Sequence, residues 1–367
     1  MAPVIGAIER RASLFHQIVV TTGQHREMLD QVLAAFAITP DVDLGLMRPD
    51  HSIGGFAGRA MTALTDLFAD LRPDAILIQG DTTTVLCAAL AAFWQGIPLG
   101  HVEAGLRSHD RRQPFPEELN REVAGLAAHL HFAPTARARD NLLREKVAAE
   151  RVFVTGNTIV DALGMLDLAG SFSEPALDEV DFGARRVILV TAHRRENHGP
   201  PMEAICQALR TLTERHADVQ VVFPVHLNPR VRGVVMRELG TTPRVLLTDP
   251  LDYDDVLRVM SRCHLILTDS GGIQEEAPSF GKPVLVLREV TERLEAVEAG
   301  MSKLVGTDAD RIVAETSLLL DDAAAYRAMS EGDNPFGDGH AGERIVSILE
   351  AHVYPAGVDQ SNPAVAL

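Results

Sequence analysis

The chain is poor in cysteine and has no long apolar run. Its three cysteines, Cys87, Cys206 and Cys263, lie far apart in 367 residues and form neither a CxxC pair nor a cluster with histidine at zinc-ligand spacing. We therefore expect no disulfide framework and no bound metal, as suits a reducing compartment. Since no run of about 18 apolar residues and no apolar leader with a cleavage site occurs, we expect a cytoplasmic protein without a membrane partner.

Positive charge is in the minority. With 34 Lys and Arg against 51 Asp and Glu, the formal net charge is −17, which repels nucleic-acid phosphates and anionic membranes at long range. Nucleic acid is therefore not expected as a partner. A local basic site for a small phosphate ligand is compatible with this charge, because a few side chains define a pocket. The 46% hydrophobic and 23% charged residues are typical of a folded chain with a sizeable core.

The sequence shows a regular alternation of short apolar, β-branched runs with longer segments of helical period. Runs of this length are typical of strands buried on both faces, and intervening helices make such strands parallel. The pattern predicts an α/β fold of the doubly wound, Rossmann-like kind. The runs are QIVVTT, DAILIQGD, PLGHVEAG, LHFAPT, RVFVTGN, RVILVTAH, VQVVFPVH, RVLLTDP, HLILTDSGG and KPVLVLRE.

A polar, acidic stretch without periodicity, GSFSEPALDEVD, interrupts this alternation. It predicts a linker between an N-terminal domain at 1–170 and a second domain at 171–340, two Rossmann-like domains that face a cleft. We expect the segment 341–367 to form a terminal helix that packs back toward the first domain, followed by a tail. Ligands of open parallel sheets bind beyond the carboxyl ends of the strands, so functional residues are expected there.

One candidate binding segment is TDSGGIQEEAP, in which a strand ends at Asp269 and a helix begins after a Ser-Gly-Gly turn. Glycines let the backbone approach a ligand closely, and the free N–H groups of a first helical turn attract anions. Ser270, Gly271 and Gly272 are therefore candidates to hold a phosphate or diphosphate, and Glu276 could accept hydrogen bonds from ribose hydroxyls. An ordinary glycine-rich turn, with Ser270 and Glu276 in capping roles, explains the same residues.

A second candidate, AHRREN, places His193, Arg194 and Arg195 where a buried strand opens into a loop. Forked cationic donors suit a diphosphate, and a histidine can donate to phosphate or carry a proton. A basic cluster on the surface is the alternative.

The first half supplies carboxylates at strand ends or helix starts, namely Asp81, Glu103 and Glu117. Three acids at one edge of a sheet can work as general acid and general base when their pKa values are pushed apart. Each also has a structural alternative: Asp81 as a helix cap, Glu103 in an ion pair, and Glu117 at a helix start after Pro116. Their joint placement favours the catalytic interpretation.

Collinear motifs from about Met1 to Glu350 closely resemble the non-hydrolysing UDP-N-acetylglucosamine 2-epimerases. The resemblance implies a GT-B-like fold, a cytoplasmic homodimer, and interconversion of UDP-GlcNAc with UDP-ManNAc without metal or nicotinamide. It also implies elimination of UDP, a bound 2-acetamidoglucal, and re-addition of UDP. The motifs are QHREMLDQVL, GDTTTVL, GHVEAGLRS, PFPEELNR, VTGNTIVDAL, VTAHRREN, PVHLNP, LTDSGGIQEEAPSFGKPVLVLR, TER and NPFGDGHA.

The resemblance also implies roles for residues at matching motif positions. The implied catalytic residues are Asp81, Glu103, Glu117 and His193. The implied UDP-binding residues are Ser270, Gly271, Gly272, Glu276 and Arg293. Some members bind a second UDP-GlcNAc as an activator, and the matching residues here are Gln24, Arg194 and His226, with Glu27 in place of a glutamine.

One departure from the family lies at the N-terminus. Members begin with a strand and a GTRPEAIKMAP-like loop, whereas this chain starts with Met1-Ala2-Pro3, the end of that motif. We therefore expect the first strand and two cations to be missing. The first domain is then expected to be destabilised, and the form that starts at Met1 to have negligible epimerase activity.

Two other functions are compatible with the same sequence. One is a hydrolysing epimerase or a retaining glycosyltransferase on the same fold. The other is a protein that binds a nucleotide sugar without turnover.

Overall fold

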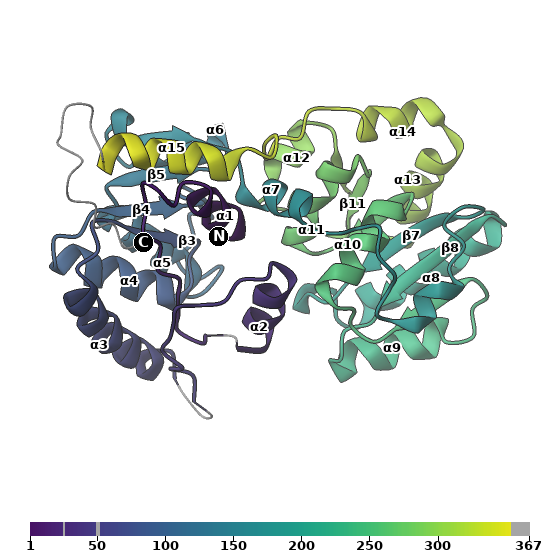
Figure 1. Ribbon diagram of the computed structural model, residues 1–367. Helices are drawn as coiled ribbons and strands as arrows, with labels where there is room; N and C mark the ends of the chain where they lie inside the picture. The colour runs from purple at the N-terminus through teal and green to yellow at the C-terminus, as the bar shows by residue number, and fades with distance from the viewer. Residues whose placement is uncertain (25, 49–51, 354–367) are drawn as a thin grey trace. The chain divides into compact units, whose positions relative to one another are not determined.

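The computed structural model describes residues 1–24, 26–48 and 52–353 and divides the chain into two compact units. Unit 1 consists of Met1–Met165 and Phe336–Leu367, and unit 2 of Leu166–Pro335. Each unit is an α/β body built on parallel strands, which confirms the predicted fold class (Figure 1).

Unit 2 holds a six-stranded sheet in the order β12-β11-β10-β7-β8-β9, with all pairs parallel. Its strands are β7 (Arg186–Thr191), β8 (Val219–Pro224), β9 (Val245–Thr248), β10 (Leu265–Thr268), β11 (Val284–Val286) and β12 (Ser302–Leu304). Its helices are α8 (Pro200–Arg215), α9 (Pro229–Leu239), α10 (Tyr253–Arg262), α11 (Gly271–Glu276), α12 (Leu294–Glu298), α13 (Ala309–Asp321) and α14 (Ala323–Ser330).

The two central strands of unit 2 are buried on both faces. All four residues of β10 and the middle of β7 are buried, so side chains of both parities pack against helices. This double burial explains why these segments read as continuous apolar runs. Because β7 and β10 are neighbours, the loops that leave their carboxyl ends start side by side in the middle of the sheet.

Unit 1 holds two separate parallel sheets. Four strands pair in the order β3-β4-β5-β6, and β1 pairs only with β2 among the described residues. The strands are β1 (Val20–Thr21), β2 (Val42–Asp43), β3 (Ile76–Gln79), β4 (Leu99–Val102), β5 (Leu130–Ala133) and β6 (Val152–Val154). The helices are α1 (Ala2–Glu9), α2 (Arg26–Ala35), α3 (Ile53–Leu71), α4 (Thr83–Trp94), α5 (Glu117–Ala127), α6 (Ala136–Arg144), α7 (Thr158–Met165) and α15 (Ala341–Val353).

A cavity of about 370 Å³ separates β1 from β3. Val20 of β1 and Ile76 and Ile78 of β3 line it, and Leu64 and Phe68 of α3 add further apolar side chains. Just past the carboxyl ends of the two strands the chain segments meet, because the hydroxyls of Thr22 and Thr84 lie 2.7 Å apart. Within the described residues, β3 hydrogen-bonds to a strand only on its β4 side. The cavity therefore lies beside the edge of β3 that has no strand partner among the described residues.

The observed boundaries lie a few residues before the expected ones at 170 and 340. The segment after Met165 belongs to unit 2 because Arg262 on α10 donates to the carbonyl oxygens of Leu168 and Gly170, each at 3.1 Å. Residues from Phe336 belong to unit 1 because the Phe336 carbonyl accepts a hydrogen bond from the backbone N–H of Asn157 at 2.6 Å.

The terminal helix α15 packs against α1 within unit 1. Val4 of α1 and Ile345 of α15 are fully buried in one apolar cluster, and Glu343 forms ion pairs with Arg10 and Arg11. Figure 1 shows the yellow α15 lying along the purple α1. The expected tail from residue 354 onward lies outside the described residues.

Candidate functional site

The candidate site of unit 2 begins where β7 and β10 end. Thr191 and Thr268 close the two strands as a register pair, and their hydroxyl oxygens lie 2.6 Å apart. The chain then continues into His193 and Arg194 on one side and into Asp269 on the other. Two of the motifs singled out from the sequence are thus brought together by strand pairing alone.

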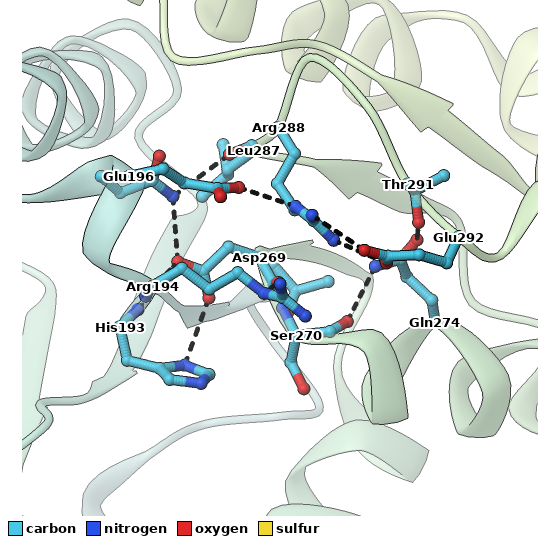
Figure 2. Close-up of polar contacts among 12 residues, drawn as sticks. His193, Arg194, Glu196, Asp269, Ser270, Gln274, Leu287, Arg288, Thr291 and Glu292 are labelled. Carbon is cyan, nitrogen blue, oxygen red and sulfur yellow. Dashed lines mark hydrogen bonds and ion pairs between the residues drawn. The ribbon is translucent and has the colours of Figure 1, made fainter. Parts of the chain in front are cut away.

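Asp269 organises the loop that carries His193. Its side chain is fully buried, and its Oδ2 accepts hydrogen bonds from the backbone N–H of His193 at 2.8 Å and of Arg194 at 2.9 Å, and from Asn197 Nδ2 at 2.9 Å. Its Oδ1 lies 3.2 Å from His193 Nδ1, as Figure 2 shows. Burial by itself would raise the pKa of Asp269, but the donors from His193 and Arg194 lower it below its usual value.

The Ser-Gly-Gly turn follows directly after Asp269. The Ser270 carbonyl accepts a hydrogen bond from Gln274 Nε2 at 2.9 Å, and Gln274 Oε1 accepts one from the Thr291 hydroxyl at 2.7 Å. Gln274 therefore ties the turn to the loop that leads to Arg293 (Figure 2). Arg293 Nε donates to Glu275 Oε1 at 2.8 Å, which holds the guanidinium beside Gly271.

A buried arginine joins two of the site's loops. Arg288 Nε donates to Glu196 Oε1 at 2.8 Å, and Arg288 Nη1 donates to Glu292 Oε2 at 3.1 Å. Although burial alone would raise it, the pKa of Glu292 is lowered to about 2 by Arg288. The loop after β7 and the loop that carries Arg293 are thus fixed to one guanidinium, as Figure 2 shows.

Glu276 is buried, and its carboxyl oxygen Oε1 accepts a hydrogen bond from the Tyr253 hydroxyl at 3.1 Å. Burial raises its pKa to about 7, so the carboxyl is partly protonated near neutral pH. Strongly perturbed pKa values cluster at functional sites, which is compatible with a ligand-binding role for Glu276.

The residues implied for an activator site come from both units. The His226 ring stacks on that of His193, with centroids 5.8 Å apart and an interplanar angle of 15°. Arg194 Nε donates to the Asp269 carbonyl at 2.9 Å, so both lie at the His193 site. Gln24 lies in unit 1, where its Oε1 accepts from the backbone N–H and the hydroxyl of Thr84. The side chain of Glu27 lies outside the description.

Unit 1 has its own group of candidate residues, which lies where β3 and β4 end. Glu103 directly follows β4 and has φ = 63°, a left-handed backbone conformation that is rare for residues other than glycine. Gln79, the last residue of β3, places its Nε2 3.5 Å from Glu103 Oε2 and 3.1 Å from the Thr158 hydroxyl. Its Oε1 accepts a hydrogen bond from the Met1 ammonium group at 2.6 Å, and burial lowers the pKa of that group to about 6.

Asp81 follows β3 and forms an ion pair with Arg121 on α5, with Oδ2 and Nη2 2.5 Å apart. Glu117, the first residue of α5, is partly exposed. Its neighbour Glu118 is fully buried, where Oε1 accepts from the backbone N–H groups of Ser108 and His109. Glu118 is therefore structural, whereas Asp81 and Glu117 are accessible to a ligand.

The structure places His193, Ser270, Gly271, Gly272, Glu276 and Arg293 together in unit 2. In unit 1, Asp81 and Glu103 follow the ends of β3 and β4, and Glu117 begins α5. Sequence reasoning assigned no role to Asp269, Arg121 or Gln274. Of these three, only Asp269 could have been found from the sequence, because it is a charged residue directly after an apolar strand.

Other chemistries find little support. Burial raises the pKa of Cys87 to about 11 and that of Cys206 and Cys263 to about 12, so none is a ready nucleophile. Over residues 1–24, 26–48 and 52–353, no three His, Cys, Asp or Glu side chains gather in a metal-binding group. No helix within this part of the chain has the length and apolar character needed to cross a bilayer.

Comparisons with known proteins agree with these motifs. Residues 7–350 match the family model described as UDP-N-acetylglucosamine 2-epimerase. The UDP-N-acetylglucosamine 2-epimerase of Bacillus subtilis is 50% identical over 352 residues, which cover 96% of this chain and 92% of that protein.

Solved structures are similar over the same length. The UDP-GlcNAc 2-epimerase of Neisseria meningitidis bound to UDP-GlcNAc superposes with a TM-score of 0.83, at 42% identity and 95% coverage of each chain. The S. aureus MnaA–UDP structure superposes with a TM-score of 0.84, at 45% identity, covering all of this chain and 95% of that one. These neighbours confirm the GT-B-like fold class.

Proposed function

Because the chain belongs to the UDP-N-acetylglucosamine 2-epimerase family, we propose that it interconverts UDP-GlcNAc and UDP-ManNAc by inverting C2 of the sugar. The structural observation that carries the proposal is the group of cationic and glycine-rich elements after β7 and β10. His193 and Arg293 flank the Ser-Gly-Gly turn. The Arg293 guanidinium and the His193 imidazole can donate hydrogen bonds to phosphate oxygens, and the glycines leave the backbone open to the same diphosphate.

In this proposal unit 2 holds the nucleotide. The turn Ser270–Gly272 contacts the diphosphate through its backbone, and His193 and Arg293 donate to the phosphate oxygens. Glu276 accepts hydrogen bonds from the ribose hydroxyls. The hydrogen bond from the Tyr253 hydroxyl holds its carboxyl group in place for this contact. The proposed route needs no redox cofactor, because each of its steps is a proton transfer or the breaking or making of the C1–O bond.

The chemistry is an elimination followed by an addition. A carboxylate among Asp81, Glu103 and Glu117 removes the C2 proton, the C1–O bond breaks with its electron pair leaving on UDP, and a C1=C2 double bond forms. The product is enzyme-bound 2-acetamidoglucal. UDP then adds back to C1 while a second acid delivers a proton to the other face of C2. His193 offsets the charge that develops on the departing UDP.

The proposal extends to the setting of the enzyme. We propose a cytoplasmic homodimer whose UDP-ManNAc supplies the synthesis of a surface polysaccharide. Gln24, Arg194 and His226 remain candidates for contacts to a second nucleotide sugar. The contact of His226 with His193 supports a link between such a ligand and the reacting one.

An extended strand in the unit 1 cavity is part of this proposal. Within the described residues, β1 and β3 have no strand partner on the sides that border this apolar space, and a strand parallel to them would pair both edges. The Met1 nitrogen lies beside the side chain of Gln79, at the carboxyl end of β3. A parallel strand would end there, so it can lead directly into α1.

The test is incubation with UDP-GlcNAc in deuterated water, with the chain itself and with a form extended by such a strand. We expect UDP-ManNAc carrying deuterium at C2, formed faster by the extended form. Free ManNAc plus UDP would identify a hydrolysing epimerase instead. Thermal stabilisation by UDP without C2 exchange in either form would identify a binding protein and overturn the proposal.

A further inference from the structure

We propose that Asp269 is a positioning residue for the reaction: it holds the His193 ring with Nδ1–H toward Asp269 and Nε2 toward the diphosphate. The inference rests on the proposed function for its catalytic consequence, but the orientation itself is a property of unit 2.

The contacts of Asp269 give its two oxygens different tasks. Oδ2 accepts hydrogen bonds from the backbone N–H groups of His193 and Arg194 and from the Asn197 amide, and these bonds fix the loop. Oδ1 is buried and has no hydrogen-bond partner within the described part of the chain, and it lies at ion-pair distance, 3.2 Å, from His193 Nδ1. One carboxylate thus fixes both the backbone and the ring of the same histidine.

The polarity of this contact sets the tautomer. Hydrogen bonds to the carboxylate keep Asp269 ionised, and an ionised carboxylate can only accept. Nδ1 must therefore carry the proton that faces Oδ1. In a neutral ring Nε2 is then the free acceptor, and in the protonated ring it is the donor.

The surroundings leave Nε2 available. The His193 side chain is 45% exposed although its Asp269 partner is fully buried, so the ring edge opposite Nδ1 reaches solvent. Charged or titratable groups around His193 in the described residues include Asp269, the stacked His226, the adjoining Arg194 and His198, whose Nε2 lies 3.4 Å from the His193 carbonyl oxygen. When UDP departs, an imidazolium at this place can donate from Nε2 to the diphosphate while Asp269 offsets its charge.

The decisive variant is Asp269→Asn. With its amide oxygen in the place of Oδ2, asparagine retains the three loop hydrogen bonds, but its NH₂ group then faces Nδ1 and favours the opposite tautomer. We expect retained UDP affinity and a kcat lowered by about 10²–10⁴-fold with little change in KM, the pattern expected when only the ring orientation is wrong. The kcat and KM values of Asp269→Asn and of the unsubstituted protein are compared in the same form of the chain, extended or not, whichever has the higher epimerase rate.

Nitrogen-15 NMR supplies a readout that a purely structural role would not move. In the unsubstituted protein, neutral His193 should show the Nδ1–H tautomer, and in Asp269→Asn the Nε2–H tautomer. Asp255→Asn is the matched control, because Asp255 is also buried and accepts the backbone N–H groups of Ser173 and Glu174, without touching a histidine. It should alter stability without altering the His193 tautomer.

The outcomes separate the two proposals. An Nε2–H tautomer in the unsubstituted protein, or an unchanged kcat in Asp269→Asn, would overturn the role of Asp269. Absence of epimerisation by the unsubstituted protein would overturn the proposed function, and the NMR result would still decide the orientation. If Asp269→Asn does not fold, the tautomer of the unsubstituted protein decides alone.

Discussion

The Arg293 guanidinium lies so close to Gly271 that a Cβ on Gly271 would be 3.1 Å from Cζ. Such a contact is tighter than ordinary packing allows, and Arg293 has little freedom to retreat because Glu275 holds its Nε at 2.8 Å. The glycine is therefore needed for the arginine to lie over the turn, as well as for a ligand to approach it.

Replacing Gly271 tests this arrangement. We expect Gly271→Val to weaken UDP binding by roughly 10–100-fold, which corresponds to the loss of one hydrogen bond to a charged group. Isothermal titration of UDP measures the effect. Gly233→Ala is the control, since Gly233 is an exposed helical glycine whose Cβ would meet no atom within 4 Å. Equal UDP affinity in both variants would refute the assignment of the turn.

Removing a carboxylate from unit 1 should affect chemistry and leave nucleotide binding intact. Asp81→Asn and Glu117→Gln are each expected to lower turnover by about 10²–10⁴-fold, the usual contribution of a general acid or base, while UDP still binds to unit 2. Solvent deuterium exchange at C2 is the measurement. Asp140→Asn removes a carboxylate from an exposed ion pair with Arg139 and should leave exchange unaltered. Undiminished exchange in both test variants would exclude these acids.

The neighbouring acid gives a contrast within one helix turn. Glu117→Gln should leave the melting temperature nearly unchanged, because the side chain is partly exposed. Glu118→Gln should destabilise unit 1 by roughly 1–3 kcal/mol, since it disturbs a buried carboxylate that accepts two backbone N–H groups and faces Arg121.

Glu276 should make stability depend on pH. Its folded-state pKa of about 7 lies above the ordinary 4.5, so the folded protein binds more protons between these values. The free energy of unfolding should therefore fall as the pH rises from about 4.5 to about 7. Glu276→Gln keeps an acceptor for Tyr253 and removes this fall, so it should be roughly 1–3 kcal/mol more stable than the parent at pH 8 and similar at pH 4.5. Denaturant titrations at both pH values decide; a parallel pH dependence in both proteins would show that Glu276 is not the titrating group.

Filling the unit 1 cavity should stabilise that unit. An extension ahead of Met1 that carries an apolar strand and a GTRPEAIK-like loop is expected to raise the melting temperature and the epimerase rate, because it pairs two free strand edges. A glycine- and serine-rich extension of equal length is the control. Full activity and the same melting temperature without the strand would show that the cavity needs no occupant.

The strands were predictable because burial on both faces leaves a continuous apolar run. Each run that we identified contains a strand, whereas β2 and β12 were missed. Those two are short edge strands with exposed residues, VD and SKL, and carry no apolar run. The run QIVVTT yields only the two residues of β1, since the cavity replaces a partner on its other side.

The site was predictable only as far as strand ends mark it. The local motifs indicated His193, Ser270 and Glu103, because polar residues directly after apolar strands are unusual. The partners of these residues were not predictable: Asp269 reaches His193 across 76 positions, and Arg121 reaches Asp81 across 40. Such pairs arise from strand order and helix placement, which no local pattern contains.

The left-handed backbone conformation of Glu103 lowers the stability of the fold at a residue that is proposed to act in catalysis. An L-residue in this conformation costs about 1–2 kcal/mol relative to glycine, and the chain bears that cost where β4 ends. Glu103→Gly should therefore be about 1 kcal/mol more stable than Glu103→Ala, although both lack the carboxylate and neither should exchange the C2 proton. If alanine proves as stable as glycine, the backbone is not strained. Selection for stability alone would favour glycine here, and the proposed role of the acid gives a reason for a side chain at this position.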